Sequence, residues 1–193
     1  YVDYMQLIQQ QGELPYNRIA PLSASHPEAL DSPLLDMLNV KYVLTAKGRA
    51  IDNPHYTLVY DGEMRIYRNE RAMPRAFLVA EGVNIPNVDE RREALRRLDP
   101  RQMVILEETP RQEQAAEVPA NFDYHVEGIT YSPNEVLITA KTPIPCFLVL
   151  GDSFFDGWKA FIRPANVVNP QQEEQEIHIY RANGNFRAVE IPA

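Results

Sequence analysis

A change of pattern near residue 122 constrains the fold of this chain more than any other feature. Before it, segments of helical and strand character alternate, whereas after it the apolar segments are short and end at Pro, Asn or Gly. Short strands bounded by such turn residues are typical of a sandwich or barrel. We therefore expect an antiparallel, jelly-roll-like β-sandwich, with strands at 124–130, 135–140, 145–150, 159–163, 176–180 and 187–191.

The N-terminal part mixes helices and strands, which predicts a mixed α/β arrangement. Pro33 suits the first position of a helix that Asp31 or Ser32 caps. Asn87, followed three residues later by Glu90, predicts a capping box at the start of another helix. In all, we expect helices at 2–10, 33–38 and 88–98, and strands at 41–45, 76–80 and 103–106.

A β-hairpin is the clearest local prediction in this part. Residues 56–60 and 64–68 are rich in strand-forming side chains, and Asp61-Gly62 lies between them. Asp-Gly between two strands is a strong hairpin signal, because both central positions of the tight turn need a positive φ. We therefore expect left-handed backbone at Asp61 and Gly62.

A polar segment at 109–121, TPRQEQAAEVPAN, contains two prolines and is typical of a linker. The sequence therefore predicts an α+β fold with a mixed α/β subdomain at 1–108 and a β-sandwich subdomain at 122–193. The chain starts at Tyr1, and its last strand stops at Pro192-Ala193. We accordingly expect a piece of a larger protein, with a sandwich that lacks its last strand here.

Composition excludes several classes of partner and site. A net charge of −8 argues against nucleic acid and anionic lipid, because both attract basic surfaces. Cys146 is the only cysteine, so an internal disulfide is excluded, and its apolar neighbours indicate a buried thiol. No run of 18 apolar residues occurs. A set of arginines interleaved with glutamates is typical of a solvated helix face: Arg91, Arg92, Arg96 and Arg97.

Several phrases of the sequence, in order, resemble the bacterial YfhO family of membrane proteins. They are LNVKYVLT at 38–45, YRNERAMPRAFLV at 67–79, ITYSPNEV at 129–136, FLVLGDSFFDGWKAF at 147–161 and RANGNFRAV at 181–189. Two features depart from the family pattern. Asp156 replaces a proline before Gly-Trp, and the excursion at 163–176 is longer and more acidic.

The resemblance implies a role beside a bacterial cell membrane. Members of the family look like polytopic proteins related to membrane glycosyltransferases that use lipid-linked sugars. This chain would be an extracytoplasmic region near the C-terminus, without catalytic residues or a cofactor of its own. Its partners would be the transmembrane part of its own parent and a cell-surface glycan or polymer that the parent helps to modify.

Trp158, the only tryptophan, allows two interpretations. An exposed Trp158 beside Phe155 and Tyr180 would stack on a sugar ring, with Asp152 and Arg181 as hydrogen-bonding partners. Alternatively the indole closes the end of the core at a hairpin corner, which is the commoner role of a large aromatic side chain. The residues favour the packing role and keep carbohydrate binding as the alternative.

Catalytic and metal chemistry finds little support in the sequence. Asp152 and Asp156 suit a turn better than a calcium or glycosidase site, because Asp accepts backbone N–H bonds there. Ser153 lacks the glycine two residues later that a nucleophile elbow requires. The four histidines have no ligand spacing. We therefore expect neither a catalytic residue nor a metal site in this chain, and a free-standing enzyme is the least favoured function.

Overall fold

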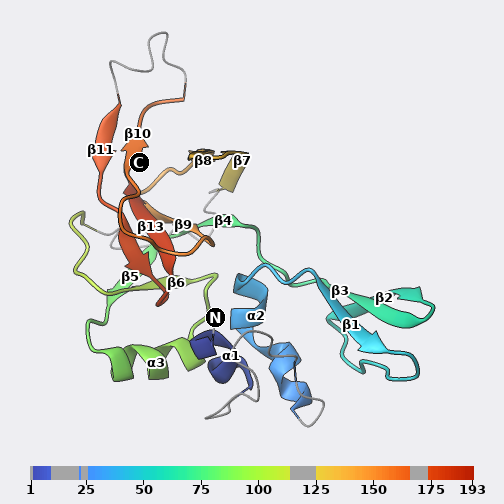
Figure 1. Ribbon diagram of the computed structural model, residues 1–193. Helices are drawn as coiled ribbons and strands as arrows, with labels where there is room; N and C mark the ends of the chain where they lie inside the picture. Colours follow the sequence, from blue (N-terminus) through green and yellow to red (C-terminus); the bar gives the residue numbers. More distant parts are fainter. Residues whose placement is uncertain (1, 10–21, 23–25, 114–124, 166–173) are drawn as a thin grey trace. The chain divides into compact units, whose positions relative to one another are not determined.

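The computed structural model describes residues 2–9, 22, 26–113, 125–165 and 174–193 (Figure 1). It has the predicted α+β fold with a sandwich-like β region. The chain divides into two compact units, Tyr1–Arg75 and Ala76–Ala193. Among the helices in the described ranges, none has the length and apolar character that a bilayer span requires.

Three short helical segments begin the first unit and contact one another: α1 (Val2–Gln9), η1 (Pro27–Asp31) and α2 (Pro33–Met37). Pro33 occupies the first turn of α2 as predicted, and Ser32 holds the capping position without a side-chain bond. Helix α2 ends before Asn39, which adopts φ 59°. Asn tolerates this left-handed conformation better than most residues, so the predicted stop is confirmed.

A three-stranded antiparallel sheet completes the first unit. Its order is β1-β3-β2, from strands β1 (Tyr42–Ala46), β2 (Tyr56–Asp61) and β3 (Met64–Asn69). The predicted hairpin is present, but the prediction of positive φ at Asp61 and Gly62 is wrong. A bulge near Val59 shifts the register, so β2 continues through Asp61, whose carboxylate binds Arg65 at 3.0 Å.

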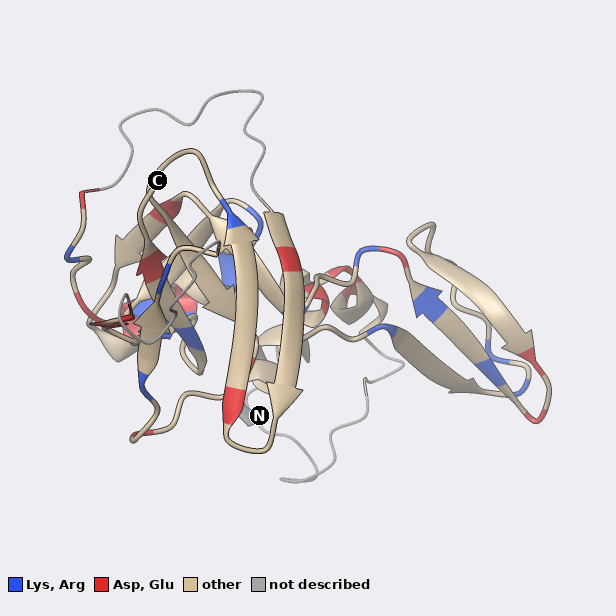
Figure 2. Cartoon of the chain, turned by 90° about the horizontal axis from the view of Figure 1, so that it is seen from above, with Lys and Arg blue, Asp and Glu red and all other residues tan. Residues whose placement is uncertain are grey.

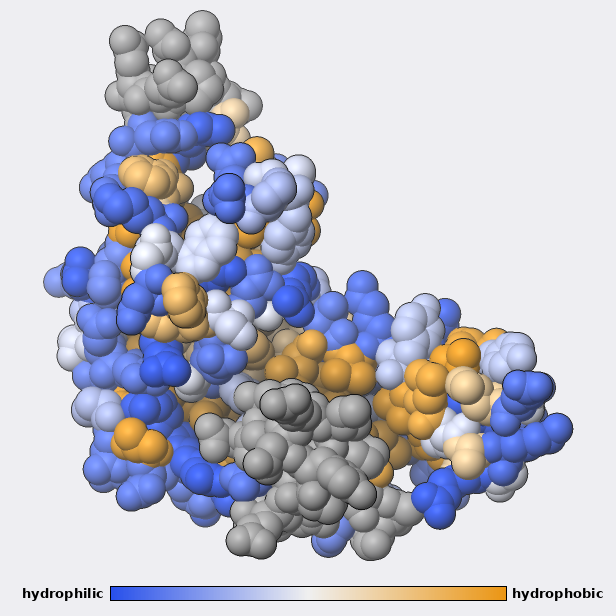
Figure 3. Space-filling model, in the orientation of Figure 1, coloured by the Kyte–Doolittle hydropathy of each residue, from blue (hydrophilic) through white to orange (hydrophobic). Residues whose placement is uncertain are grey.

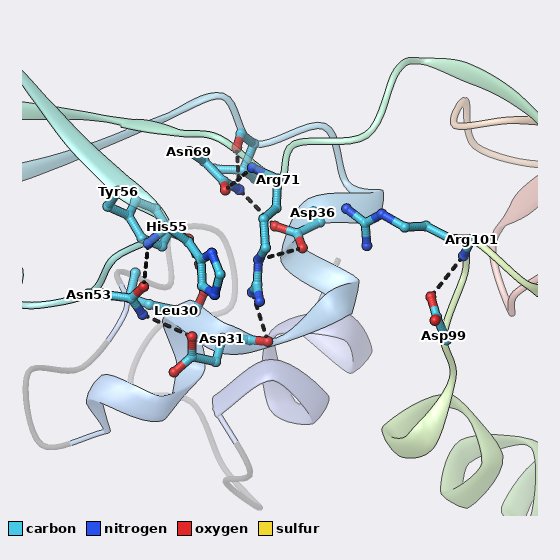
Figure 4. Close-up of polar contacts among 11 residues, drawn as sticks. Leu30, Asp31, Asp36, Asn53, His55, Tyr56, Asn69, Arg71, Asp99 and Arg101 are labelled. Atoms are coloured by element: carbon cyan, nitrogen blue, oxygen red, sulfur yellow. Dashed lines mark hydrogen bonds and ion pairs between the residues drawn. The ribbon is translucent and has the colours of Figure 1, made fainter.

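A buried polar network joins α2 to the base of this hairpin (Figure 4). The Asp36 side chain is 1% exposed and accepts a hydrogen bond from Asn69 Nδ2 at 2.8 Å. Arg71 Nε lies 3.2 Å from the same carboxylate, and Arg71 Nη2 donates to the carbonyl of Asp31 at 3.0 Å. Tyr56 donates its hydroxyl proton to the Leu30 carbonyl at 3.0 Å. The network fixes the strands by bonds to helix side chains and carbonyls.

A six-stranded sheet forms the framework of the second unit. Its order is β4-β9-β13-β12-β6-β5, and it is antiparallel except for the parallel pair β5–β6, which α3 connects. These elements are β4 (Ala76–Val79), β5 (Glu81–Asn84), α3 (Val88–Arg97), β6 (Met103–Leu106), β9 (Cys146–Leu150), β12 (Tyr180–Ala182) and β13 (Phe186–Ile191).

This sheet is curled, because its two edge strands follow one another directly in the chain. Val79 pairs with β9 at one edge, Glu81 pairs with β6 at the other, and only Ala80 separates them. Consecutive Cα atoms are about 3.8 Å apart, so the edges meet at this point. Gly82 makes the curl possible, because a Cβ there would lie 2.5 Å from the Phe147 ring.

A second layer covers one face of β4 and β9. The hairpin β7–β8 (His125–Ser132 and Glu135–Lys141) packs its apolar side chains on Ala76, Leu78, Cys146, Leu148 and Leu150. Both observed layers contain strands that follow residue 121, as the predicted sandwich requires. The six-stranded sheet, however, also contains β4, β5 and β6, which precede the predicted linker.

The division into units therefore differs from the predicted subdomains 1–108 and 122–193. The predicted linker at 109–121 falls within the second unit, since β6 before it and β12 after it are paired through Leu106 and Ala182. Residues 114–121 of that segment lie outside the described ranges. Apolar pairing between strands distant in sequence produces this division, and a local change of composition does not reveal it.

Helix α3 corrects a second prediction. Asn87 caps it by accepting bonds from the backbone N–H groups of Asp89 and Glu90, as expected. Leu95 is buried, whereas Val88 is 67% exposed. Arg91 is buried instead of solvated: it donates to the Ile85 carbonyl at 2.8 Å. It also pairs with Glu107 at 3.2 Å, and this ion pair supplies the compensation that a buried charge needs.

Removing the Asp36 carboxylate tests the polar network of the first unit. We expect Asp36→Ala to lower the free energy of unfolding by about 3 kcal/mol, because Arg71 and Asn69 lose their buried acceptor. Asp61→Ala is the matched control; it breaks a more exposed pair with Arg65 and should cost below about 1 kcal/mol. Urea unfolding followed by circular dichroism measures both. Equal losses in the two variants would contradict a structural role for the network.

Candidate functional site

The predicted Trp158 region is positioned by the pairing of β9 with β13. This antiparallel ladder places Leu150 opposite Arg187. Asp152, two residues beyond Leu150, then receives a hydrogen bond from Arg187 Nη2 at 2.8 Å. The segment 151–159 therefore passes over the face of β13 that carries Arg187. Residues about 35 apart in sequence thereby become partners.

Arg187 lies between this carboxylate and the Trp158 indole. Its guanidinium carbon is 4.5 Å from the centroid of the ring, a cation–π contact. The Arg187 side chain is only 10% exposed, whereas Trp158 remains 39% exposed. The guanidinium covers one face of the indole, so the exposed part is the rest of the ring. Arg187 thus holds one face of the Trp158 ring, and Trp158 also lines a cleft.

The cleft has a volume of about 370 Å³ and lies within the second unit. Trp158 and Phe155 line it from the turn after β9, and Phe155 is 73% exposed. Gly157, between them, has φ 103°, a backbone conformation that disfavours any side chain. The other lining residues come from the end of β11 (Gln175–Ile177), from the two residues before β12 and from the segment after β6: Ile177, His178, Ile179 and Arg111.

A carboxylate of β13 fixes the wall that carries Arg111. Glu190 Oε1 accepts the backbone N–H groups of Arg111 and Gln112, both at 2.8 Å. Its other oxygen accepts the Tyr180 hydroxyl at 3.1 Å. Burial raises the pKa of Tyr180, so the phenol keeps the proton that it donates. The backbone of Arg111 is therefore held by Glu190 and the buried Tyr180, and its side chain extends from a fixed point.

The remaining charges around the cleft are mostly paired. Lys159 Nζ lies 3.2 Å from Glu176, and His178 Nε2 lies 3.1 Å from Glu108. Neither Arg111 nor Asp156 has an ion-pair partner within the described ranges. The exposed groups that the cleft offers to a ligand thus include the Trp158 and Phe155 rings, the Arg111 guanidinium and the Asp156 carboxylate.

The structure separates the five predicted site residues into a surface pair and a supporting set. Trp158 and Phe155 line the cleft together, as predicted for stacking. Tyr180 is 0% exposed and lies against His178 at 4.6 Å, so it does not offer a surface ring. Asp152 is occupied by Arg187, and Arg181 lies 3.6 Å from Glu107 and 5.7 Å from the Phe154 ring.

Asp152 and Arg181, which were expected to bond a sugar, form ion pairs with Arg187 and Glu107, and neither is among the residues that line the cleft. The opposite face of β12 from Arg181 is the buried one, since burial alternates along Tyr180, Arg181 and Ala182. Trp158 is 39% exposed and lines the cleft, so it is not buried as a residue that closes the core would be.

Sequence reasoning missed Arg111 and Arg187. Arg111 lay in the predicted linker, where no pattern distinguished it from its polar neighbours. Arg187 lay in a predicted strand, where the alternation placed it on one face but not against an aromatic ring 29 positions earlier. Partners this distant in sequence leave no spacing signal, so only the β9–β13 register identifies them.

The turn between β9 and β10 (Ala160–Ile162) is held by bonds to Asn185. Asn185 Nδ2 donates to Ser153 Oγ at 3.1 Å, and the Phe154 N–H bonds the Asn185 carbonyl. These contacts give the turn a structural role. Burial raises the pKa of the Cys146 thiol, which disfavours the reactive thiolate. In the part of the chain that the structure describes, no group of three His, Cys, Asp or Glu side chains is placed to hold a metal.

Comparisons with known proteins give no match: no family model, no curated protein and no solved structure is significantly similar to this chain.

The ion pair behind Trp158 generates a prediction that its fluorescence can report, since the chain has one tryptophan. We expect Asp152→Ala to release Arg187 from the indole and to increase quenching of Trp158 by acrylamide. The same change should lower the free energy of unfolding by about 2 kcal/mol, because Arg187 loses a charged hydrogen bond. Asp156→Ala, which removes a carboxylate without an ion pair in the described ranges, is the control. Equal quenching in the two variants would refute the support of Trp158 by Asp152.

Proposed function

We propose that this chain is a non-catalytic, glycan-binding accessory domain of a polytopic bacterial membrane protein similar to the YfhO family. It lies on the extracytoplasmic side and helps its parent to modify a cell-surface glycan or polymer. The observation that carries the proposal is the cleft in which Trp158 and Phe155 are exposed side by side.

Sugar rings present apolar C–H faces that pack on aromatic rings, while their hydroxyls need polar partners near the rim. The cleft supplies both, with Asp156 and Arg111 beside the two rings. Arg187 holds the Trp158 ring in one orientation before a ligand arrives. A ring that is already fixed loses little conformational entropy on binding, and this preorganisation favours affinity.

Glycan binding is tested with the isolated chain on a glycan array and by titration of Trp158 fluorescence. We expect Trp158→Ala to weaken binding of a recognised glycan at least about tenfold, because the stacking platform is lost. Phe161→Ala is the matched control, since Phe161 is an aromatic residue of β10 that is 53% exposed and does not line the cleft.

Binding of the Trp158→Ala variant is followed by calorimetry, because that variant has no tryptophan signal. Its circular dichroism must match that of the unchanged chain. Absence of binding on the array, or a folded Trp158→Ala variant with unchanged affinity, would overturn the glycan-binding function.

The role beside a membrane has its own supporting observation in the first unit. Ile66 of β3 lies opposite Leu44 of β1 on one side and opposite Tyr60 of β2 on the other. The three side chains therefore share one face of the β1-β3-β2 sheet. Figure 3 shows hydrophobic residues gathered over this sheet, and Figure 2 shows most of its ribbon without charge. We call this the apolar sheet face; its large exposed apolar members are Tyr42 (53%), Leu44 (59%), Tyr60 (51%) and Met64 (42%). Arg68, opposite Tyr42, lies on the same face and pairs with Glu70 at 2.8 Å.

An exposed apolar face of several large side chains marks a contact surface, because single exposed residues are common but contiguous groups are not. Tyrosine is enriched where protein meets the membrane–water interface, and two tyrosines belong to this face. We propose that the apolar sheet face packs on the transmembrane part of the parent.

Crosslinking in the full-length parent tests this contact. A photoreactive amino acid at Leu44 should yield, in native membranes, peptides joined to the parent's transmembrane segments. The same group at Asp61, which register places on the opposite face, is the control. A parent gene without about ten upstream apolar segments of about 20 residues each would overturn the membrane role.

A further inference from the structure

We propose that the Trp158 cleft selects anionic saccharides, with Arg111 as the residue that binds the acidic substituent. This inference rests on the proposed glycan-binding function and adds the chemical class of the ligand. It starts from the charge balance of the cleft wall.

The cations around the cleft differ in what they already bind. Lys159 lies 3.2 Å from Glu176, and Arg187 bonds Asp152 at 2.8 Å behind the indole. Arg111 lines the cleft, is exposed, and has no ion-pair partner among the described residues. A paired cation has little attraction left for a ligand anion, whereas an unpaired guanidinium keeps its full charge and its five donors.

The position of Arg111 is built into the fold. Its backbone N–H lies 2.8 Å from Glu190 Oε1 and 3.0 Å from the Tyr180 hydroxyl oxygen. Tyr180 and Glu190 belong to two paired strands, so the root of the side chain is fixed relative to the cleft. Binding an anion therefore orders only the Arg111 side chain, which limits the entropic cost.

The chemistry of the guanidinium defines the ligand class. Its planar fork matches the two oxygens of a carboxylate or of a phosphate group. Phe155 and Trp158 on the same cleft select a ring with an apolar face. Asp156 accepts hydrogen bonds from hydroxyl groups, which every sugar supplies, and its charge opposes a ligand that carries the anion at that end. A sugar ring with one acidic substituent, a uronic acid or a sugar phosphate, satisfies all three.

The test compares matched ligands by calorimetry at low ionic strength. Trigalacturonic acid and its methyl ester have the same rings with and without charge, and glucose 6-phosphate against glucose makes the same comparison for phosphate. We expect the acid of at least one pair to bind tenfold or more tightly than its neutral partner. The Arg111→Gln variant should abolish this preference, because it lowers the affinity for the acid tenfold or more and that for the neutral ligand by much less.

Lys159→Gln is the control, because it removes a positive charge that is already paired and should leave the preference within threefold. Equal affinity for acid and neutral partner, or a preference that survives Arg111→Gln, overturns the anion selectivity alone. Failure of every saccharide to bind, together with an empty glycan array, overturns the glycan-binding function on which it rests. The backbone of Arg111, rather than its side chain, makes the bonds to the core, so the variant retains them.

Discussion

The antiparallel pairing of β9 with β13 is the constraint on which the second unit depends. It joins two segments about 40 residues apart and sets Leu150 opposite Arg187, which brings Asp152 onto the guanidinium. The turn that follows then passes over the face of β13 that carries Arg187, and Trp158 makes a cation–π contact with the same arginine. On the inner side, Glu190 of β13 bonds Tyr180 of β12 and the backbone of Arg111. Side chains of β13 therefore hold both the turn that carries Trp158 and the backbone of Arg111, and these two parts line the cleft.

Electrostatic pairing explains why this arrangement leaves an open site. Arg181 and Arg187 lie directly opposite each other on β12 and β13, a placement of like charges that destabilises a sheet unless it is compensated. Glu107 and Asp152 supply the compensation. Acidic residues near the strands are thereby used for structure, and the cleft keeps a guanidinium that is not neutralised.

In the first unit, buried polar contacts hold one end of the sheet, and apolar side chains are exposed beyond it. A buried carboxylate, Asp36, gathers donors from Asn69 and Arg71 and so fixes the base of the hairpin. The strands beyond that base are then free to present apolar side chains outward, including Leu44 and Tyr60. A sheet held at one end by polar bonds does not need to bury both faces.

Local signals in the sequence were sufficient for most elements of the fold. Asn87 capped its helix and Pro33 began one, because both depend on neighbouring residues alone. The Asp61-Gly62 turn failed, since a bulge in β2 changed the register that the turn must close. Left-handed backbone instead occurs at Asn183 and Gly184, between β12 and β13. That Asn-Gly signal was present in the sequence, but we expected one strand at 176–180 and did not predict the hairpin. In the structure two strands lie there: β11 (Gln175–Ile177) pairs with β10, and β12 joins the large sheet.

The sequence by itself determined the α+β class, the positions of most strands and the presence of an aromatic turn around Trp158. Those properties follow from side-chain type and short-range spacing. Only the tertiary structure decided that Trp158 is open to a cleft, that Asp152 and Arg181 serve ion pairs, and that Arg111 is the unpaired cation. Each of these depends on partners 29 to 79 positions away. Contacts of that range are set by strand register, and no local pattern of residues encodes it.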